Sequence, residues 1–164
     1  MSLQSIPVGS AAPADNCNCL AIRQAARHVT QFYDQLLAPV GLRATQLAIL
    51  GYLRRRGPMT INGLATALVM DRTTLGRNIL PLERDRLIEI APGNADRRRR
   101  ELRLSEAGLA RYHAAIERWS TAQARFETVF GSERAAALRE LLRGVVASDF
   151  GQSEAAGAAR EEGG

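Results

Sequence analysis

The chain has 164 residues and a formal net charge of +5, with a pI of about 10.2. This length suits one domain with a buried core, or one domain with an added dimerisation element. Every basic residue is an arginine, and a basic excess attracts nucleic acid or anionic membrane surfaces. We expect no membrane span and no secretory signal, because no apolar run is long enough. With only two cysteines, we therefore expect a protein of the reducing cytoplasm.

The chain opens with a segment that we expect to be a flexible arm, residues 1–15, which contains two prolines and several small residues. Residues 16–40 follow, with helical periodicity over more than four turns, and are predicted to be a dimerisation helix. Asp15, Asn16 and Asn18 are candidate caps for this helix, which we expect to start near Cys19, and Pro39 and Gly41 favour its end. Its apolar positions are Ile22, Ala25, Ala26, Val29, Phe32, Tyr33, Leu36 and Leu37.

Residues 41–104 read as a winged helix-turn-helix. One helix is predicted from Thr45 to about Arg55, with Leu47, Leu50 and Leu53 facing inward. A short helix capped by Thr60 follows, and then a tight turn leads into a third helix that begins at Asp71. A helix, a short turn and a second helix are the geometry of a helix-turn-helix.

The helix that begins at Asp71 has one apolar face and one polar face. Leu75, Ile79 and Leu82 form the apolar stripe, and Pro81 predicts a kink. The polar face gathers side chains that read base edges and hold phosphates in a major groove. An ordinary solvated helix face is the alternative. The polar candidates are Arg72, Thr73, Thr74, Arg77 and Asn78.

The segment after this helix predicts a basic hairpin. Ile88 and Ile90 alternate with polar residues, as do Leu102 and Leu104, which indicates two short strands. Turn residues lie between them, followed by four consecutive arginines at 97–100. Such a run is often only a solvated patch, but here it lies in a hairpin directly after a candidate recognition helix. The combination favours DNA binding, with Arg97, Arg98 and Arg99 as contact residues.

Residues 105–150 are predicted to form two further helices that dimerise. Ser105 opens the first, Gly131 ends it, and Ser132 is expected to cap the second. We expect Trp119 and Phe126 to anchor the contact between subunits, although they could instead pack within their own chain. Residues 151–164 are expected to be disordered. The heptad seam of the first helix is Leu109, Tyr112, Ile116, Trp119, Gln123, Phe126 and Phe130.

Nothing in the sequence indicates an enzyme. His28 and His113 lie on different predicted helices, and no cluster of residues has the spacing of a metal site. A glycine-rich phosphate loop and a nucleophile elbow are also missing. We therefore predict no catalytic residue, metal or cofactor. A winged helix used only for protein interaction, without specific DNA binding, is the alternative function, and the arginine-rich wing argues against it.

The order of elements resembles that of the MarR family of bacterial transcription regulators, from about Cys19 to Phe150. The resemblance rests on GLRATQLAIL at 41–50, DRTTLGRN at 71–78 with PLER at 81–84, and DRR at 96–98 with LSEAG at 104–108. It implies a mainly α winged helix-turn-helix with a two-stranded β wing and long dimerisation helices. In the family, the wing arginine that matches Arg98 enters the minor groove, and the residue that matches Asp96 orients the wing.

The resemblance further implies a homodimer that binds a pseudo-palindromic operator in double-stranded DNA and usually represses transcription. Such proteins release DNA when a small molecule or an oxidant binds. The peroxide-sensing branch carries a reactive cysteine that matches Cys19, where a helix N-terminus favours the thiolate. Tyr33 matches a supporting tyrosine of that branch, but Arg23 stands where the branch has a second tyrosine. Cys17 would then pair across the subunits.

The competing signal is a small aromatic or acyl ligand bound between the dimerisation helices and the DNA-reading part. The sequence names no such ligand. The side chains that could line its site are His28, Phe32, Tyr33, His113 and Trp119.

Overall fold

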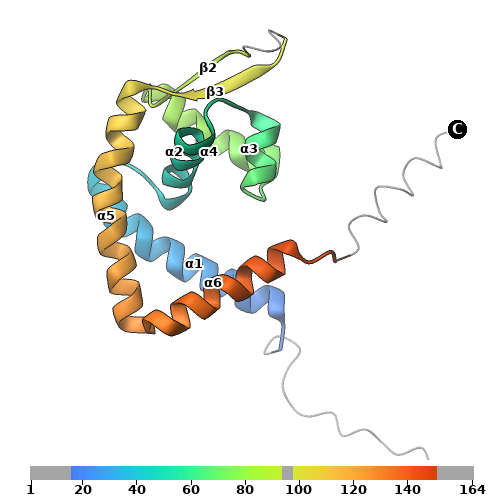
Figure 1. Cartoon of the computed structure of the whole chain (residues 1–164), viewed down its shortest axis with the longest axis vertical. Coiled ribbons are helices and arrows are strands. Elements are labelled where there is room, and N and C mark those ends of the chain that lie inside the picture. Colours follow the sequence, from blue (N-terminus) through green and yellow to red (C-terminus); the bar gives the residue numbers. More distant parts are fainter. Residues whose placement is uncertain (1–15, 94–97, 151–164) are drawn as a thin grey trace, which may run out of the picture. The chain divides into compact units, whose positions relative to one another are not determined.

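The computed structural model describes residues 16–93 and 98–150 (Figure 1). The chain divides into two compact units, residues 1–122 and 123–164. The predictions for residues 1–15 and 151–164, and for Asp96 and Arg97, lie outside the described residues. Unit 1 contains α1 (Asn18–Leu37), the 3₁₀ helix η1 (Ala38–Val40), α2 (Ala44–Arg56), β1 (Met59–Thr60), α3 (Ile61–Ala67), α4 (Arg72–Arg84), β2 (Ile88–Pro92), β3 (Arg100–Leu104) and most of α5 (Glu106–Phe130); unit 2 holds the end of α5 and α6 (Ser132–Ala147).

Helix α1 begins one residue earlier than expected and has a different cap. Its N-cap is Cys17, whose Sγ accepts a hydrogen bond from the backbone N–H of Leu20 at 3.4 Å. The expectation of a cap at Asp15, Asn16 or Asn18 is wrong, because Cys17 is the N-cap and Asn18 is already the first helical residue. The cysteine side chain therefore satisfies one of the free N–H groups of the first turn.

The core of unit 1 is built from the apolar stripes that the sequence predicts. Leu47, Leu50 and Leu53 of α2 are buried. The stripe of α4 is buried as well, with Leu75 fully enclosed. Helix α4 runs through Pro81 as one element. The core cluster comprises Leu37, Leu42, Leu47, Ile49, Leu50, Leu53, Leu64, Ala65, Leu75, Ile79, Leu82, Leu87, Ile88, Leu102 and Ala115.

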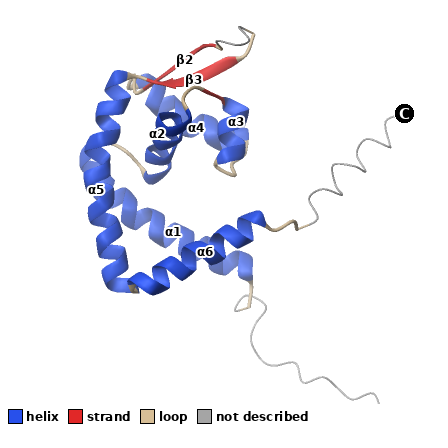
Figure 2. Cartoon of the chain, viewed as in Figure 1, coloured by secondary structure: helices blue, strands red, loops and turns tan. Residues whose placement is uncertain are grey.

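The strands, drawn red in Figure 2, form one antiparallel sheet of order β1-β3-β2. The expected two-stranded wing is therefore incomplete, since a third strand, Met59–Thr60, pairs with β3. Met59 lies opposite Leu102, and Thr60 lies opposite Glu101. Two residues are too short to show a period-two pattern, so this strand has no signal in the sequence. It attaches the wing to the start of α3.

Helix α5 is fastened to the end of α4 by Ser105. The Ser105 hydroxyl donates to the carbonyl oxygen of Arg86 at 2.7 Å and accepts from the backbone N–H of Gly108 at 2.9 Å. Gly108 approaches the chain so closely that a Cβ there would collide with the carbonyl oxygen of Leu87. The segment that follows α4 and the start of α5 are therefore joined tightly within unit 1.

Unit 2 is a helical hairpin that turns at Gly131. This glycine has φ of 95°, in the region that residues with a side chain rarely adopt. Gly131 is also the N-cap of α6, so the prediction that Ser132 caps this helix is wrong. Glu127 ties the two helices together, because it accepts from Gln123 at 2.9 Å and from Arg139 at 3.2 Å.

Candidate nucleic-acid interface

The N-terminus of α4 is rigidly capped. One carboxylate oxygen of Asp71 accepts from the backbone N–H of Thr74 at 2.8 Å, and the other accepts from the Thr74 hydroxyl at 2.6 Å. The Thr74 hydroxyl, followed by its backbone N–H, holds the pKa of Asp71 below the usual value by stabilising the carboxylate. The predicted cap is confirmed. Because the Thr74 hydroxyl hydrogen is used in the hydrogen bond to Asp71, the hydroxyl oxygen faces any ligand as an acceptor.

The face of α4 opposite the core presents the predicted base-reading side chains to solvent. Arg72, Thr73, Thr74 and Arg77 are all exposed. They lie in the first two turns, which is where a recognition helix contacts bases. A buried face therefore holds the helix on the core while two guanidinium groups and two hydroxyl-bearing side chains project outward.

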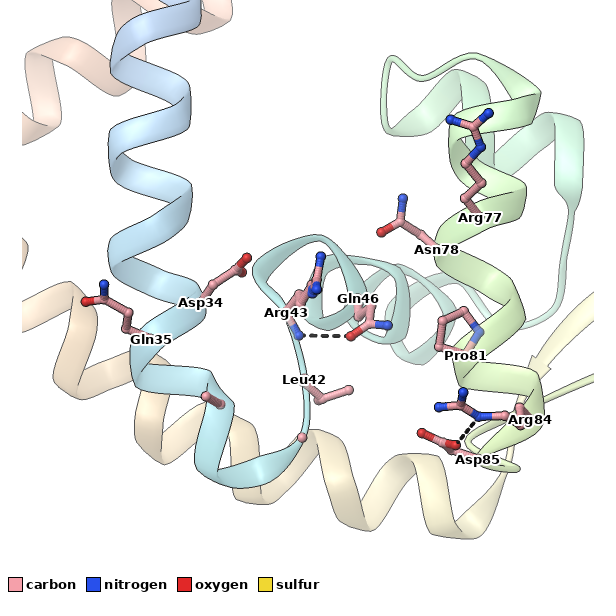
Figure 3. Close-up of a pocket in the computed structure, with 12 residues that line it drawn as sticks. Asp34, Gln35, Leu42, Arg43, Gln46, Arg77, Asn78, Pro81, Arg84 and Asp85 are labelled. Carbon is pink, nitrogen blue, oxygen red and sulfur yellow. Dashed lines mark hydrogen bonds and ion pairs between the residues drawn. The ribbon is translucent and has the colours of Figure 1, made fainter.

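Asn78 differs from the other predicted readers because it is half-buried. Its Nδ2 donates to the carbonyl oxygen of Thr74 at 2.9 Å, within the same helix. Figure 3 shows its amide directed away from α4 toward the start of α2. Asn78 would have to rotate to reach a base edge.

The wing presents further arginines. Arg98, Arg99 and Arg100 are exposed, and Arg100 donates to the carbonyl oxygen of Ile90 at 3.3 Å across the hairpin. Arg103 is half-buried and donates to the carbonyl oxygen of Pro92 at 3.3 Å, with Glu101 3.6 Å away. Arg103 therefore braces the two strands, whereas Arg98, Arg99 and Arg100 are exposed nearer the tip.

A cleft of about 840 Å³ lies beside α4 (Figure 3). The end of α1, the start of α2 and the second half of α4 meet around it. No sequence pattern indicates this cleft, because its walls come from segments that are far apart along the chain. It is lined by Asp34, Gln35, Ala38, Gly41, Leu42, Arg43, Gln46, Arg77, Asn78, Pro81, Arg84 and Asp85.

Hydrogen bonds inside the cleft hold the start of α2 in place. Asp34 on α1 accepts from the backbone N–H of Ala44 at 2.7 Å, a contact that fixes α2 against α1. Gln46 accepts from the backbone N–H of Arg43 at 2.9 Å. At the opposite wall, Arg84 and Asp85 form an ion pair of 3.0 Å.

The residues proposed from the sequence as a ligand site are not brought together here. None of the five candidates lines the cleft. His28 is exposed on α1, and His113 is exposed on α5 beside the ring of Tyr112. Phe32 and Tyr33 pack edge to face with ring centres 5.4 Å apart.

The two cysteines are both exposed at the start of α1. Tyr33 follows Cys19 by fourteen residues on the same helix, which separates them by about 21 Å along its axis. Any support of a Cys19 thiolate by Tyr33 would therefore need a second subunit. The sequence reasoning missed that Cys17 is the residue engaged with the helix N-terminus, because it placed the helix start at Cys19.

In residues 16–93 and 98–150, no three His, Cys, Asp or Glu side chains are grouped so that they could hold a metal ion. In the same residues, no single helix is long and apolar enough to cross a membrane.

Residues 40–99, from the end of η1 to the wing, match the sequence model of the MarR family. MosR, a transcriptional regulator of Mycobacterium tuberculosis, is 28% identical with a TM-score of 0.69; the match covers 82% of this chain and 98% of MosR. No curated protein matches the chain in sequence.

Two further solved structures share the fold. The transcriptional repressor CouR, bound to a 23-mer DNA duplex, is 23% identical with a TM-score of 0.73, and the match covers 80% of this chain and 94% of CouR. BpsR of Bordetella bronchiseptica, whose DNA binding is regulated by 6-hydroxynicotinic acid, is 22% identical with a TM-score of 0.73; the match covers 86% of this chain and all of BpsR, 100%.

Proposed function

The chain belongs to the MarR family of winged-helix transcription regulators, which are non-enzymatic DNA-binding proteins, and on that premise we propose that it is a homodimeric repressor of its target genes. In this proposal, α4 reads the major groove and the wing follows the adjacent minor groove of a pseudo-palindromic operator. The observation that carries it is the exposed face of α4, with Arg72, Thr73 and Arg77 on a helix that is capped and backed by the core.

Arg77 has the main base-reading role in this proposal. It lies in the second turn of α4 and has no carboxylate partner among the described residues, so its guanidinium can make a bidentate contact with guanine. Arg72 and Thr73 would contact bases or neighbouring phosphates. In the wing, Arg98 would enter the minor groove while Arg97 and Arg99 bind phosphate, and Asp96 would orient the wing for these contacts.

The test is binding of operator duplexes measured by fluorescence anisotropy at fixed salt. Arg77→Ala should lower affinity by about 1–3 kcal/mol and relax preference at one base position. Arg98→Ala should weaken binding most where the adjacent minor groove is narrow and A·T-rich. Arg118→Ala, at an exposed arginine of α5, is the matched control and should leave affinity unchanged. Half-sites should lie about one helical turn apart, near 10 base pairs.

A chain that binds no duplex would contradict the proposal. Retention on heparin and duplex DNA should fall steeply with salt if arginines bind phosphates. Retention that does not depend on salt, together with capture of a protein partner, would instead favour the winged-helix interaction module.

The dimer is supported by apolar side chains that the single chain leaves exposed. On α6, Leu141 is 69% exposed and Val145 is 41% exposed. In the heptad seam, Trp119 is 39% exposed, whereas Phe126 is half-buried against Phe130 at 5.4 Å between ring centres. A second copy would cover α6 and Trp119, so α6 contributes more to the proposed contact than the seam alone suggests.

Release of DNA by a chemical signal is the remaining part of the proposal. For oxidation, the exposed Cys17 and Cys19 are the targets. A disulfide across the subunits would change the distance between the two α4 helices of the dimer. Operator binding should be measured in graded organic hydroperoxide for wild type, Cys17→Ser and Cys19→Ser. Redox control predicts release for wild type and retention for Cys19→Ser. An identical response of all three proteins would leave a small-molecule ligand as the signal.

A further inference from the structure

The solvent-facing side of α4 carries a large apolar side chain among its polar ones. Leu80 is 64% exposed, although the apolar stripe of the same helix is buried. It follows Arg77 by three residues, so the two side chains lie on the same side of the helix, one turn apart. Single apolar residues on a protein surface are common, and the exposure of Leu80 alone would indicate nothing. Its place beside the proposed base-reading arginine makes it a candidate for contact with DNA.

Gly76 is an independent observation on the same side of α4. It precedes Leu80 by four residues and therefore lies one turn nearer the start of the helix. Glycine is less favourable than alanine inside a helix. The packing of the chain gives no reason for it: among the described residues, outside its own helix backbone and chain neighbours, no heavy atom lies within 4 Å of a Cβ placed there. A glycine without a steric cause inside the chain fits a place where a ligand approaches the backbone closely.

Thr73 continues this line toward the start of α4. Thr73, Gly76 and Leu80 follow one another at spacings of three and four residues, which places them along one side of the helix. These three residues are called the apolar strip of α4, because the threonine contributes its methyl group. The strip is about 10.5 Å long, or about three base-pair steps of a DNA duplex. The exposed Arg72 and Arg77 border it, and this cationic border favours a polyanion as the partner.

We infer that the apolar strip reads the C5 methyl group of a thymine, and that Gly76 lets α4 come close enough to the base for Leu80 to cover this methyl group. The inference rests on the proposed function, in which α4 lies in the major groove of an operator. Thymine is the base that presents a methyl group in that groove, so an apolar contact there specifies sequence. Leu80 lies about 4.5 Å from Arg77 along the helix axis, so the thymine should lie within about two base pairs of the guanine that Arg77 contacts.

The first experiment removes only the methyl group from the DNA. The probe is a duplex that the wild-type protein selects from a random-sequence library, and each thymine of one half-site is replaced in turn by deoxyuridine, which lacks the C5 methyl group. For wild type, one replacement within about two base pairs of the position read by Arg77 should weaken binding about fourfold, the effect expected for one methyl-sized apolar group. For Leu80→Ala, the same replacement should have no effect. The absence of a sensitive thymine, or an equal loss for both proteins, would overturn the inference.

The second experiment tests the close approach at Gly76. Gly76→Ala should raise the melting temperature of the free protein, because alanine is the better helix former. The same variant should bind the selected duplex at least about tenfold more weakly, because its new methyl group occupies space that the base requires. The rise in melting temperature shows that the variant is folded. A stabilised variant with unchanged affinity would therefore contradict the close approach.

Light scattering separates a DNA contact of Leu80 from a contact between subunits. Leu80→Ala should leave the mass in solution and the melting temperature as they are in wild type. A loss of mass in this variant would assign Leu80 to a subunit contact and overturn the inference. Failure of the inference can also be told apart from failure of the proposed function. A protein that binds a selected duplex equally well with thymine or deoxyuridine would contradict only the apolar strip, whereas a protein that binds no duplex would contradict both.

Discussion

Unit 1 contains a buried cluster of large apolar side chains, whereas the described part of unit 2 leaves most of its own in solvent. In unit 1, α2, α4 and the sheet share one cluster in which Leu50 and Leu75 are fully buried. In the described part of unit 2, Ala135 is the buried apolar residue, while Leu141 is 69% and Val146 is 65% exposed. Burial of apolar area is the main favourable term in folding. The difference therefore indicates that unit 1 is held by its own core and that unit 2 depends on a second surface.

The largest expected effect comes from replacing exposed apolar side chains on α6 of unit 2. Leu141 and Val145 lie one helical turn apart on α6, and burial of each side chain in a dimer is worth about 1.5–3 kcal/mol. Leu141→Ser with Val145→Ser should raise the dimer dissociation constant by at least about 100-fold. Light scattering should then give the mass of one chain, 17.8 kDa, where wild type gives twice that value. Ala136→Ser, at an exposed position of α6, is the control, and a double variant that stays dimeric would exclude α6 from the contact.

The next effect tests the core of unit 1. Leu75→Ala removes a fully buried side chain and should lower the free energy of unfolding by about 2–5 kcal/mol. Leu80→Ala on the same helix, at a side chain 64% exposed, should change it by less than about 0.5 kcal/mol. Urea unfolding at fixed protein concentration gives both values. Equal losses would mean that Leu80 is also covered, as a dimer or ligand contact would require.

A smaller effect concerns the close contact between Gly108 of α5 and the backbone of Leu87, which follows α4. Gly108→Ala would force a methyl group against the carbonyl oxygen of Leu87, and overpacking of this kind costs about 1–3 kcal/mol. Gly76→Ala, within α4 where nothing lies near a new Cβ, should instead stabilise the protein by up to about 1 kcal/mol. The two changes are chemically identical, so opposite shifts of the melting temperature would locate the strain at this contact. A Gly108→Ala variant as stable as wild type would contradict the close approach.

The smallest effect is the pH dependence of the α4 cap. Hydrogen bonds from Thr74 lower the pKa of Asp71 below its usual 3.8 in the folded chain. The stabilisation is therefore present above the unfolded pKa and is lost as pH falls through the lower folded pKa. Asp71→Asn keeps an acceptor for the helix but does not titrate, so the melting temperature of the variant should fall less between pH 5 and pH 2. Parallel curves for the two proteins would contradict the shift.

The parts of the fold that sequence patterns predict are those with local causes. The stripe of Leu75, Ile79 and Leu82 and the cap at Asp71 both depend on residues within a few positions of each other, and both are confirmed. The β1 strand was missed, because its two residues take their conformation from a partner some forty positions later. Helix starts at Asn18 and Ser132 were misplaced by one residue, because several polar residues there compete as caps.

The candidate site also combines features that local sequence patterns predict with features that depend on distant residues. The exposure of Arg72, Thr73 and Arg77 follows from helical periodicity and could be predicted. The cleft could not, because Asp34, Arg43 and Arg84 come from three helices whose packing decides whether they meet. The aromatic residues chosen from the sequence as ligand contacts were selected by chemistry alone, without knowledge of which ones share a cavity.

Thr60 belongs to two elements at once: it pairs with Glu101 in the sheet, and its hydroxyl accepts from the backbone N–H of Gly63 to start α3. Exchange of the wing with that of another protein would therefore have strict limits. Any replacement would have to keep the pairing of Pro92 with Arg100 and the hydrogen bond from the backbone N–H of Gly93 to the carbonyl oxygen of Arg99 at 2.7 Å. One residue inserted within β3 would turn Leu102 outward and break its register with Met59, and the start of α3 would shift with it.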